Sequence, residues 1–238
     1  MPLPELTLYV TSRCNLSCDG CIMGHFMREN RDYEMSLAEL ATFIRVTQES
    51  RYRLDLIICG GEPLLWNHLR EGLQMIRHAQ ISRRILLFTN AVNIARVDDA
   101  VMSCLSELRV SGYACNAANT TILQQRYPAK TKAVDRRVFY RQPAQALDGT
   151  RPCVCTNREC LYMNGKVYAC PHGASVNDGL DRLADGTPLY VPLQAGYLAG
   201  LAAIRSAQEA RLCTKCSSNI KVRKVTARFP KKDRALLS

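Results

Sequence analysis

The chain has 238 residues, of which 47% are apolar, and its formal net charge is +11 at pH 7. This length allows one sizeable domain, or a main domain with a small appendage. The sequence has no signal peptide and no apolar run of about 18 residues, which argues against secreted and membrane-spanning proteins and predicts a cytoplasmic one. Twelve cysteines in such a chain indicate metal or redox chemistry rather than a disulfide framework.

Strand-like and helix-like patterns alternate along the first 150 residues. Short apolar runs predict strands at 6–10, 54–59, 85–88, 108–113 and 138–140. Helical spacing predicts a helix capped by Ser36 and Glu39, a second over 64–78, and a third that begins at Asp98 or Asp99. Trp66 and Cys104 are expected in the core. This alternation predicts a parallel sheet, and the conspicuous polar motifs follow the carboxyl ends of its strands.

The first of these motifs is a run of three cysteines after the first strand. Cys14, Cys18 and Cys21 have the spacing C-x3-C-x2-C, which supplies three soft thiolates from one loop. A four-iron cubane binds four thiolates, and a structural zinc site also needs a fourth ligand nearby. The next cysteine, Cys59, ends an apolar run. The spacing therefore predicts a cluster with one open iron.

The second motif is Gly60-Gly61-Glu62-Pro63, directly after the second strand. Together with the cysteine loop it resembles the radical S-adenosylmethionine (SAM) superfamily. The resemblance implies an α/β fold, a partial (β/α)6 TIM-like barrel, over residues 1–150. It also implies a [4Fe–4S] cluster held by Cys14, Cys18 and Cys21, whose fourth iron chelates the amino and carboxylate groups of SAM.

The same resemblance assigns residues that contact SAM. The two glycines let the backbone approach the ligand closely, and Glu62 offers a carboxylate to the cationic amino group. Thr89-Asn90 and Ser111, at later strand ends, correspond to positions that contact the methionine or ribose in relatives. The expected SAM contacts are Gly60, Gly61, Glu62, Pro63, Thr89, Asn90 and Ser111.

From residue 151 the alternation stops and cysteines become frequent. Cys153-x11-Gly165-x4-Cys170 resembles the opening of the SPASM and Twitch extensions, and Cys213-x2-Cys216 follows a predicted helix at 196–211. The resemblance implies a small iron–sulfur, Twitch-like domain over 151–238 with a basic tail and one auxiliary [4Fe–4S] cluster. The expected ligands are Cys153, Cys160, Cys170, Cys213 and Cys216. The fourth ligand, beside Cys170, Cys213 and Cys216, is one of Cys153, Cys155 and Cys160, with Cys160 slightly favoured. Zinc is the alternative metal.

The resemblance implies reductive cleavage of SAM to a 5′-deoxyadenosyl radical, which removes a hydrogen atom from an unactivated carbon. An auxiliary cluster that accepts an electron would give dehydrogenation. A thiol that returns a hydrogen atom would give epimerisation, and Cys59, Cys115 and Cys155 are the candidate donors.

Only 13 residues precede Cys14, so we expect no peptide-recognition element there and predict a small polar metabolite as substrate: a sugar, aminocyclitol or nucleoside. Arg136, Arg137 and Arg141 are candidate contacts for an anionic group on it. A flavodoxin- or ferredoxin-type protein is the expected electron donor, and neither a membrane nor a nucleic acid is expected as a partner. The alternatives are modification of a ribosomal peptide, by epimerisation or thioether formation, and a zinc-binding nucleic-acid module.

Overall fold

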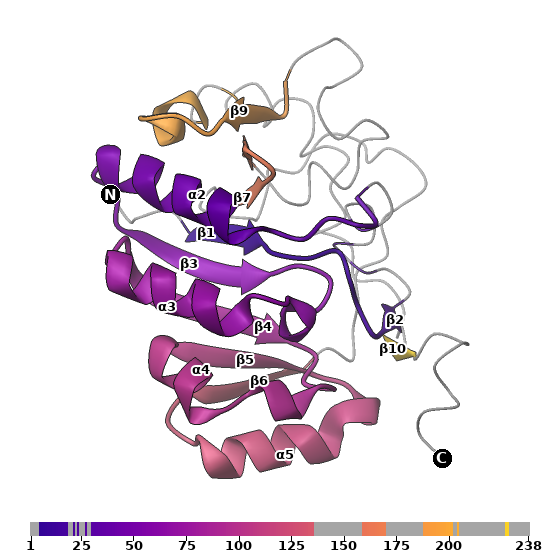
Figure 1. Ribbon diagram of the computed structural model, residues 1–238. Helices are drawn as coiled ribbons and strands as arrows, with labels where there is room; N and C mark the ends of the chain where they lie inside the picture. The colour runs from indigo at the N-terminus through magenta and orange to yellow at the C-terminus, as the bar shows by residue number, and fades with distance from the viewer. Residues whose placement is uncertain are drawn as a thin grey trace, which may run out of the picture.

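The computed structural model describes residues 5–18, 21, 23, 27, 30–135, 159–169, 188–201, 204 and 227–228. Within these residues the main sheet has the strand order β6-β5-β4-β3-β1-β7-β8-β9, and all neighbours from β6 to β7 are parallel (Figure 1). Its strands are β1 Glu5–Tyr9, β3 Leu54–Cys59, β4 Ser82–Thr89, β5 Glu107–Gly112, β6 Thr131–Asp135, β7 Glu159–Met163, β8 Lys166–Tyr168 and β9 Tyr190–Pro192. A two-stranded sheet pairs β2 Ser17–Cys18 with β10 Ala227–Arg228.

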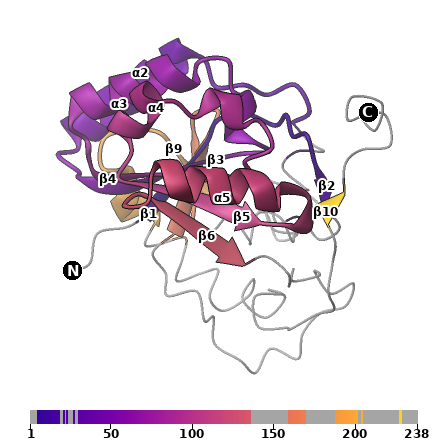
Figure 2. The ribbon, with the colours of Figure 1, turned by 90° about the horizontal axis from the view of Figure 1, so that it is seen from below.

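Helices connect the parallel strands. The α-helices are α2 Leu37–Glu49, α3 Leu69–Ala79, α4 Asp99–Cys104 and α5 Ala117–Arg126, and the 3-10 turns are η1 Pro63–Leu65, η2 Ile94–Arg96 and η3 Ala114–Asn116. Figure 1 shows α2 and α3 on the near side of the sheet, running alongside β1 and β3, and Figure 2 shows α5 beside β5 and β6.

Strand alternation gives the sheet two different faces. We call the outer face the one whose side chains, such as Leu8, Ile58 and Leu87, form one buried cluster with residues of α2, α3, α4 and α5. The inner face is the opposite one. It carries Tyr9 and Cys59, which belong to a second cluster on the other side of the sheet. Helices therefore cover the outer face, as in a partial barrel.

The predicted fold class is confirmed: the chain is a mixed α/β protein with a parallel sheet compatible with a partial TIM-like barrel. Strand β6 and helix α5 were not predicted, because α5 carries few apolar residues and buries only Thr120 and Leu123. The helix expected from residue 64 begins at Leu69, since η1 occupies the start of that segment. The strand expected at 138–140 lies outside the described residues.

Three details of the predicted helices and core are confirmed and one differs. Ser36 caps α2, accepting from the Glu39 backbone N–H at 3.1 Å. The Glu39 side chain does not complete a capping box, since it accepts from the Tyr33 hydroxyl and the Asn164 N–H instead. Trp66 is fully buried and donates to the Met35 carbonyl at 2.8 Å, and Cys104 is buried as predicted.

The described part of the C-terminal region is joined to the barrel sheet. Strand β7 pairs in parallel with β1, and β8 and β9 follow it as antiparallel neighbours. The division between residues 150 and 151 remains a prediction. The tail also reaches the cysteine loop, because Ala227 pairs with Cys18 and Arg228 with Ser17.

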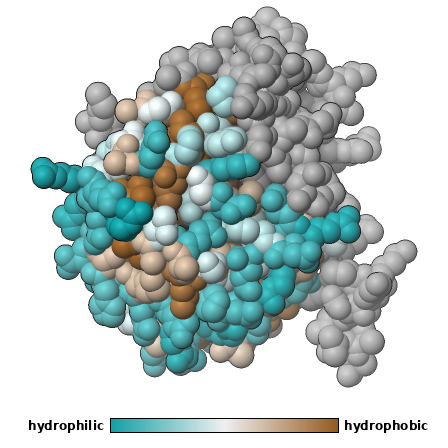
Figure 3. All heavy atoms as spheres, turned by 45° about the horizontal axis from the view of Figure 1, so that its top comes forward, coloured by the Kyte–Doolittle hydropathy of each residue, from teal (hydrophilic) through white to brown (hydrophobic). Residues whose placement is uncertain are grey.

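The face of the molecule seen in Figure 3 is mostly polar where the structure describes it. In the view of Figure 3, hydrophilic residues predominate and hydrophobic ones form separate small groups. Among the described residues, Ile122 is the one large hydrophobic side chain that is exposed. None of the described helices combines the length and the apolar character needed to cross a membrane.

Candidate functional site

The three N-terminal cysteines lie in one loop that leaves the carboxyl end of β1. The Cys21 N–H donates to the Cys18 carbonyl at 3.2 Å, and the Leu16 N–H approaches the Cys14 Sγ at 3.5 Å. Burial, with smaller contributions from negative charge on Glu62, Cys21 and Cys18, raises the pKa of the Cys14 thiol to about 12. The loop thus brings the three thiols into one electrostatic neighbourhood.

The two glycines of the second motif hold this loop in place. The Gly61 N–H donates to the Thr11 carbonyl and the Glu62 N–H to the Arg13 carbonyl, both at 2.7 Å. A Cβ at Gly60 would stand 2.5 Å from the Thr11 oxygen, and one at Gly61 would stand 2.3 Å from the Arg13 oxygen. Glycine is required here because the loop after β3 touches the backbone that leads into Cys14. The predicted reason was a close approach to a ligand; the structure shows a close approach between two protein segments.

An ion-paired anchor missed from the sequence supports the same loop. Glu34 accepts from the Arg13 guanidinium at 2.6 Å and from the Asn67 N–H and side-chain amide at 2.8 and 3.0 Å. Arg13 also donates to the Leu65 carbonyl, at the end of η1. The residue before the first cysteine is therefore fixed to the segment that follows Pro63.

Glu62 lies inside the protein rather than toward a ligand. Its side chain is 1% exposed and accepts from the Thr89 hydroxyl at 2.6 Å, the Asn90 N–H at 2.7 Å and the Leu64 N–H at 3.0 Å. Burial raises the pKa of Glu62 to about 7, although these hydrogen bonds act in the opposite direction. This placement does not agree with the predicted contact between Glu62 and the amino group of SAM, because its oxygens already accept from Thr89 and Asn90 at the end of β4 and from Leu64 in η1.

Thr89, also a predicted SAM contact, binds protein groups in the structure. Its hydroxyl donates to Glu62 and accepts from the Ala91 N–H at 2.8 Å. Pro63 is buried as the first residue of η1. These two residues shape the strand ends.

Two asparagines connect the strand ends to the cysteine loop and to each other. The Asn90 side chain donates to Asn15 Oδ1 at 2.7 Å and lies 4.0 Å from the Cys14 Sγ. Asn116 is 1% exposed; its amide donates to the Asn90 and Ser111 carbonyls, and its Oδ1 accepts from the Tyr113 N–H. Of the predicted SAM contacts, Asn90 and Ser111 are thus brought together at one edge of the sheet. Asn116 was missed because a single asparagine in a helix start carries no distinctive sequence signal.

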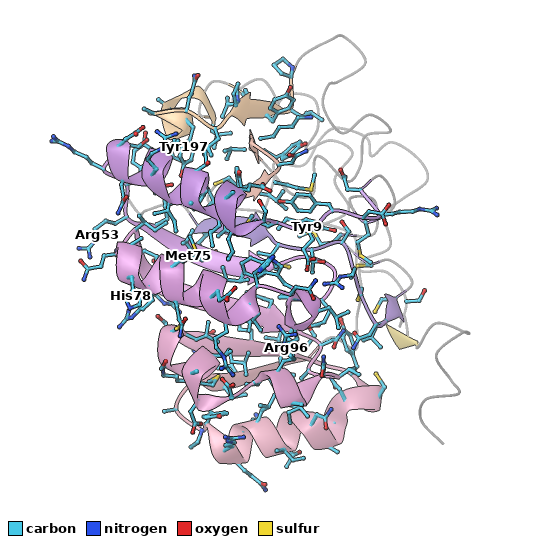
Figure 4. All side chains as sticks on the ribbon, viewed as in Figure 1. Tyr9, Arg53, Met75, His78, Arg96 and Tyr197 are labelled. Atoms are coloured by element: carbon cyan, nitrogen blue, oxygen red, sulfur yellow. The ribbon has the colours of Figure 1, made fainter. Side chains whose placement is uncertain are left out.

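Tyr9 and Cys59 are partners in the β1–β3 register and lie beside the cysteine loop, where Cys59 and Cys21 contact the same inner cluster. Figure 4 shows Tyr9 toward the carboxyl ends of the strands, whereas Arg53 and His78 lie toward the opposite ends. Burial raises the pKa of Tyr9, with further contributions from Cys59, Cys21 and Cys14. Cys59 therefore faces the site rather than the helices. Cys115 is exposed in η3, near the same strand ends.

Cys160 does not fit its predicted role. Cys160 lies in β7, where it pairs with Leu6 of β1. Its side chain is fully buried in the outer cluster, and its Sγ approaches the Glu5 carbonyl at 3.5 Å. An auxiliary cluster at this point would have to displace packed apolar side chains, so the placement contradicts Cys160 as a ligand. The other cysteines and arginines predicted for the tail lie outside the described residues: Cys153, Cys155, Cys170, Cys213, Cys216, Arg136, Arg137 and Arg141.

The residues of the loop suit an iron–sulfur cluster by their chemistry. Thiolates are the usual ligands of such clusters, and three from one loop leave one iron open. Tetrahedral zinc would hold its thiolates about 4 Å apart, whereas a cubane binds each through a different iron. Within the described part of the chain, no three His, Cys, Asp or Glu side chains converge on a single ion. Cys14, Cys18 and Cys21 would hold the cluster, with Asn90 and the Gly60–Gly61 backbone beside it.

Comparison with known proteins gives the same assignment. Residues 8–117 match the model of the radical SAM superfamily. The chain is 27% identical over 124 residues to a GTP 3′,8-cyclase of Mycolicibacterium smegmatis and 30% identical over 93 residues to one of Mycobacterium marinum. These matches cover 51% and 39% of the chain but only 34% and 26% of the two relatives.

Solved structures resemble the fold over most of the chain. BtrN in complex with AdoMet and 2-DOIA has a TM-score of 0.66 and 14% identity, covering 92% of this chain and 94% of BtrN. The structure anSMEcpe with bound AdoMet has a TM-score of 0.57 and 14% identity, covering 92% of this chain and 84% of that one. With its cysteine loop, its Gly-Gly-Glu-Pro turn and this fold, the segment from residue 8 to residue 117 is a radical SAM domain.

Proposed function

We propose that the protein is a radical SAM enzyme that abstracts a hydrogen atom from a small polar metabolite and completes a dehydrogenation or an epimerisation. The observation that carries the proposal is the cysteine loop itself. It is held by the Gly60–Gly61 backbone on one side and by Asn90 on the other, at the carboxyl edge of a parallel sheet. When bound, a reduced [4Fe–4S] cluster supplies the electron that splits SAM into methionine and the 5′-deoxyadenosyl radical.

The chain's own residues supply binding and orientation. The Gly60–Gly61 backbone, Asn90 and Ser111 are the proposed SAM contacts. Glu62 and Asn116 act one layer behind them as positioning residues, because they fix the ends of β3, β4 and β5. For the tail we propose an auxiliary [4Fe–4S] cluster on Cys153, Cys170, Cys213 and Cys216, with Cys155 as the alternative to Cys153. A flavodoxin- or ferredoxin-type protein remains the proposed electron donor.

One of the comparisons bears on the substrate class, and the other bears on the architecture alone. The curated relatives act on GTP by name, which supports a purine nucleotide or nucleoside. BtrN shares the fold over nearly its whole length and is known with 2-DOIA bound, but at 14% identity this similarity supports the architecture and not the substrate.

The proposal is tested with anaerobically reconstituted protein, SAM and a strong reductant, measuring 5′-deoxyadenosine. We expect its formation by the wild type and background levels with Cys14→Ala. Metal analysis accompanies the assay: about four irons per chain indicate one cubane and about eight indicate two. Zinc without iron, or iron-loaded protein that leaves SAM intact, would overturn the proposal.

The two outcomes of the reaction are separated by solvent isotope. Thiol hydrogens exchange with water, so an epimerase working in D2O incorporates deuterium into its product, whereas a dehydrogenase does not. Cys59 is the described candidate donor on the inner face, and Cys115 is the exposed alternative. With epimerisation, we expect Cys59→Ala to retain SAM cleavage and lose deuterium incorporation, and Cys115→Ala to retain both.

A further inference from the structure

A row of side chains crosses the inner face at the level of Cys59. Tyr9 pairs with Cys59, Phe88 with Arg109, and Arg109 with Lys132 in successive strands. Because Ile58 pairs with Leu87, the residues that follow them, Cys59 and Phe88, lie opposite each other in the same register. The row therefore leads from the cysteine loop to two cations on β5 and β6.

Arg109 is held in a defined orientation. Its guanidinium carbon lies 5.1 Å from the centroid of the half-buried Phe88 ring, and its Nε donates to Glu107 Oε1. Stacking on an aromatic ring and a bond through Nε both restrict the side chain, leaving the two terminal nitrogens as a planar fork. Within the described residues, those terminal nitrogens have no hydrogen-bond acceptor, and the side chain is 31% exposed.

The charges around Arg109 do not balance. Glu107 is 6% exposed and is the carboxylate shared by Arg109, by Lys132 at 2.8 Å and by Arg84 at 3.3 Å. Arg84 is also 3.9 Å from Asp55, which binds Arg83 at 3.3 Å. Three cations converge on one buried carboxylate, and an excess of positive charge remains beside Arg109 and the 65% exposed Lys132.

The position of this excess relates it to the proposed active site. Arg109 precedes Ser111 by two residues on the same strand, so it lies about 7 Å further into the sheet on the same face. It is two strands from Cys59, about 10 Å across the sheet. A small molecule with an anionic group at Arg109 is therefore within reach of the thiol side of the inner face.

We propose that Arg109 and Lys132, oriented by Glu107, bind an oxyanion of the substrate, a phosphate or a carboxylate. This inference rests on the proposed function for its biological meaning, but the site itself is testable without catalysis. Arginine's fork matches two oxygens of either group, and an adjacent ammonium adds a point charge.

The test measures binding of inorganic pyrophosphate and, separately, of succinate to the reconstituted wild-type protein by calorimetry. Tighter binding of pyrophosphate assigns a phosphate, and tighter binding of succinate assigns a carboxylate. We expect Arg109→Gln to weaken binding of the preferred anion about tenfold or more, since a charge-assisted hydrogen bond contributes about 1.5–3 kcal/mol. Lys132→Gln, at an exposed position that should not affect folding, should also weaken anion binding. Arg109→Lys should keep only part of the wild-type affinity.

A matched control exists on the opposite side of the fold. Arg126 stacks on Tyr127 at the same 5.1 Å and binds Asp99 at 3.3 Å, but it lies on α5. Arg126→Gln should leave anion binding unchanged. The proposal fails if the wild type binds neither anion, if Arg126→Gln costs as much as Arg109→Gln, or if Arg109→Gln weakens only SAM binding. A wild-type protein that binds the anion but forms no 5′-deoxyadenosine would instead overturn the proposed function alone.

Discussion

Ile58 and Cys59 are neighbours at the end of β3 but belong to different parts of the molecule. Ile58 joins the outer cluster under the helices, and Cys59 faces the inner side next to the cysteine loop. Cys160 repeats the contrast, since it is a cysteine on the outer face and is packed among apolar residues. The comparison shows that strand parity, and not cysteine identity, decides which thiols are available for chemistry.

The largest effect expected from this comparison is at the cysteines themselves. Cys14→Ala removes one of three cluster thiolates, and it should abolish SAM cleavage and lose the iron of the SAM-binding cluster, while the iron of the proposed auxiliary cluster remains. Cys160→Ala removes a thiol of the outer core and should cost some stability while leaving iron content per folded chain at the wild-type value. Equal iron loss in both variants would contradict the distinction between the two faces.

A backbone substitution gives the next largest effect. Gly61→Ala places a Cβ against the Arg13 carbonyl and should lower the free energy of unfolding by about 3 kcal/mol, because both partners are backbone and neither can move alone. Gly200→Ala is the control, since its nearest neighbour is the Val191 side chain at 3.0 Å. Denaturant unfolding of the two variants measures the difference. A Gly61→Ala protein as stable as Gly200→Ala would mean that the loop contact is not tight.

Asn116 offers a smaller test at the strand ends. Asn116→Ala loses two donated hydrogen bonds and one accepted bond in a buried position, and should destabilise the protein by about 2 kcal/mol. It should also weaken SAM binding, since Ser111 and Asn90 lose their common partner. Asn119→Ala, which loses bonds to two loop carbonyls further from Ser111, should leave SAM binding intact. Equal SAM affinity in the two variants would argue against the positioning role.

The last effect concerns pH. The pKa of Glu62 is about 7 in the folded protein, above its ordinary value of 4.5, so the folded state holds this proton more tightly than the unfolded state. The stability that follows is fully present below pH 4.5 and is lost as the pH rises through 7. Melting temperatures of Glu62→Gln should therefore depend less on pH between 4.5 and 7 than those of the wild type. Glu49→Gln, which alters a surface ion pair on α2, should keep the wild-type profile.

Much of the fold and part of the site followed from the sequence. Apolar runs located β1, β3, β4 and β5, because buried parallel strands are nearly continuous in apolar residues. The cysteine spacing and Gly60–Gly61 located the site, because both are local signals. The roles of Glu62 and Asn116 were not predictable, since they depend on which strand ends become neighbours. Cys160 was misassigned because its position in the sequence resembles that of a cluster ligand. Its environment depends on pairing with β1, about 155 residues away in the chain.

The central claim is that the loop of Cys14, Cys18 and Cys21 holds a cluster whose open iron binds SAM. Electron paramagnetic resonance of the reduced, reconstituted protein with and without SAM tests it most directly. We expect a [4Fe–4S]+ signal whose g-values change when SAM is added, and no such change in Cys14→Ala. A wild-type protein with no cluster signal, or with a signal that SAM leaves unaltered, would contradict the account.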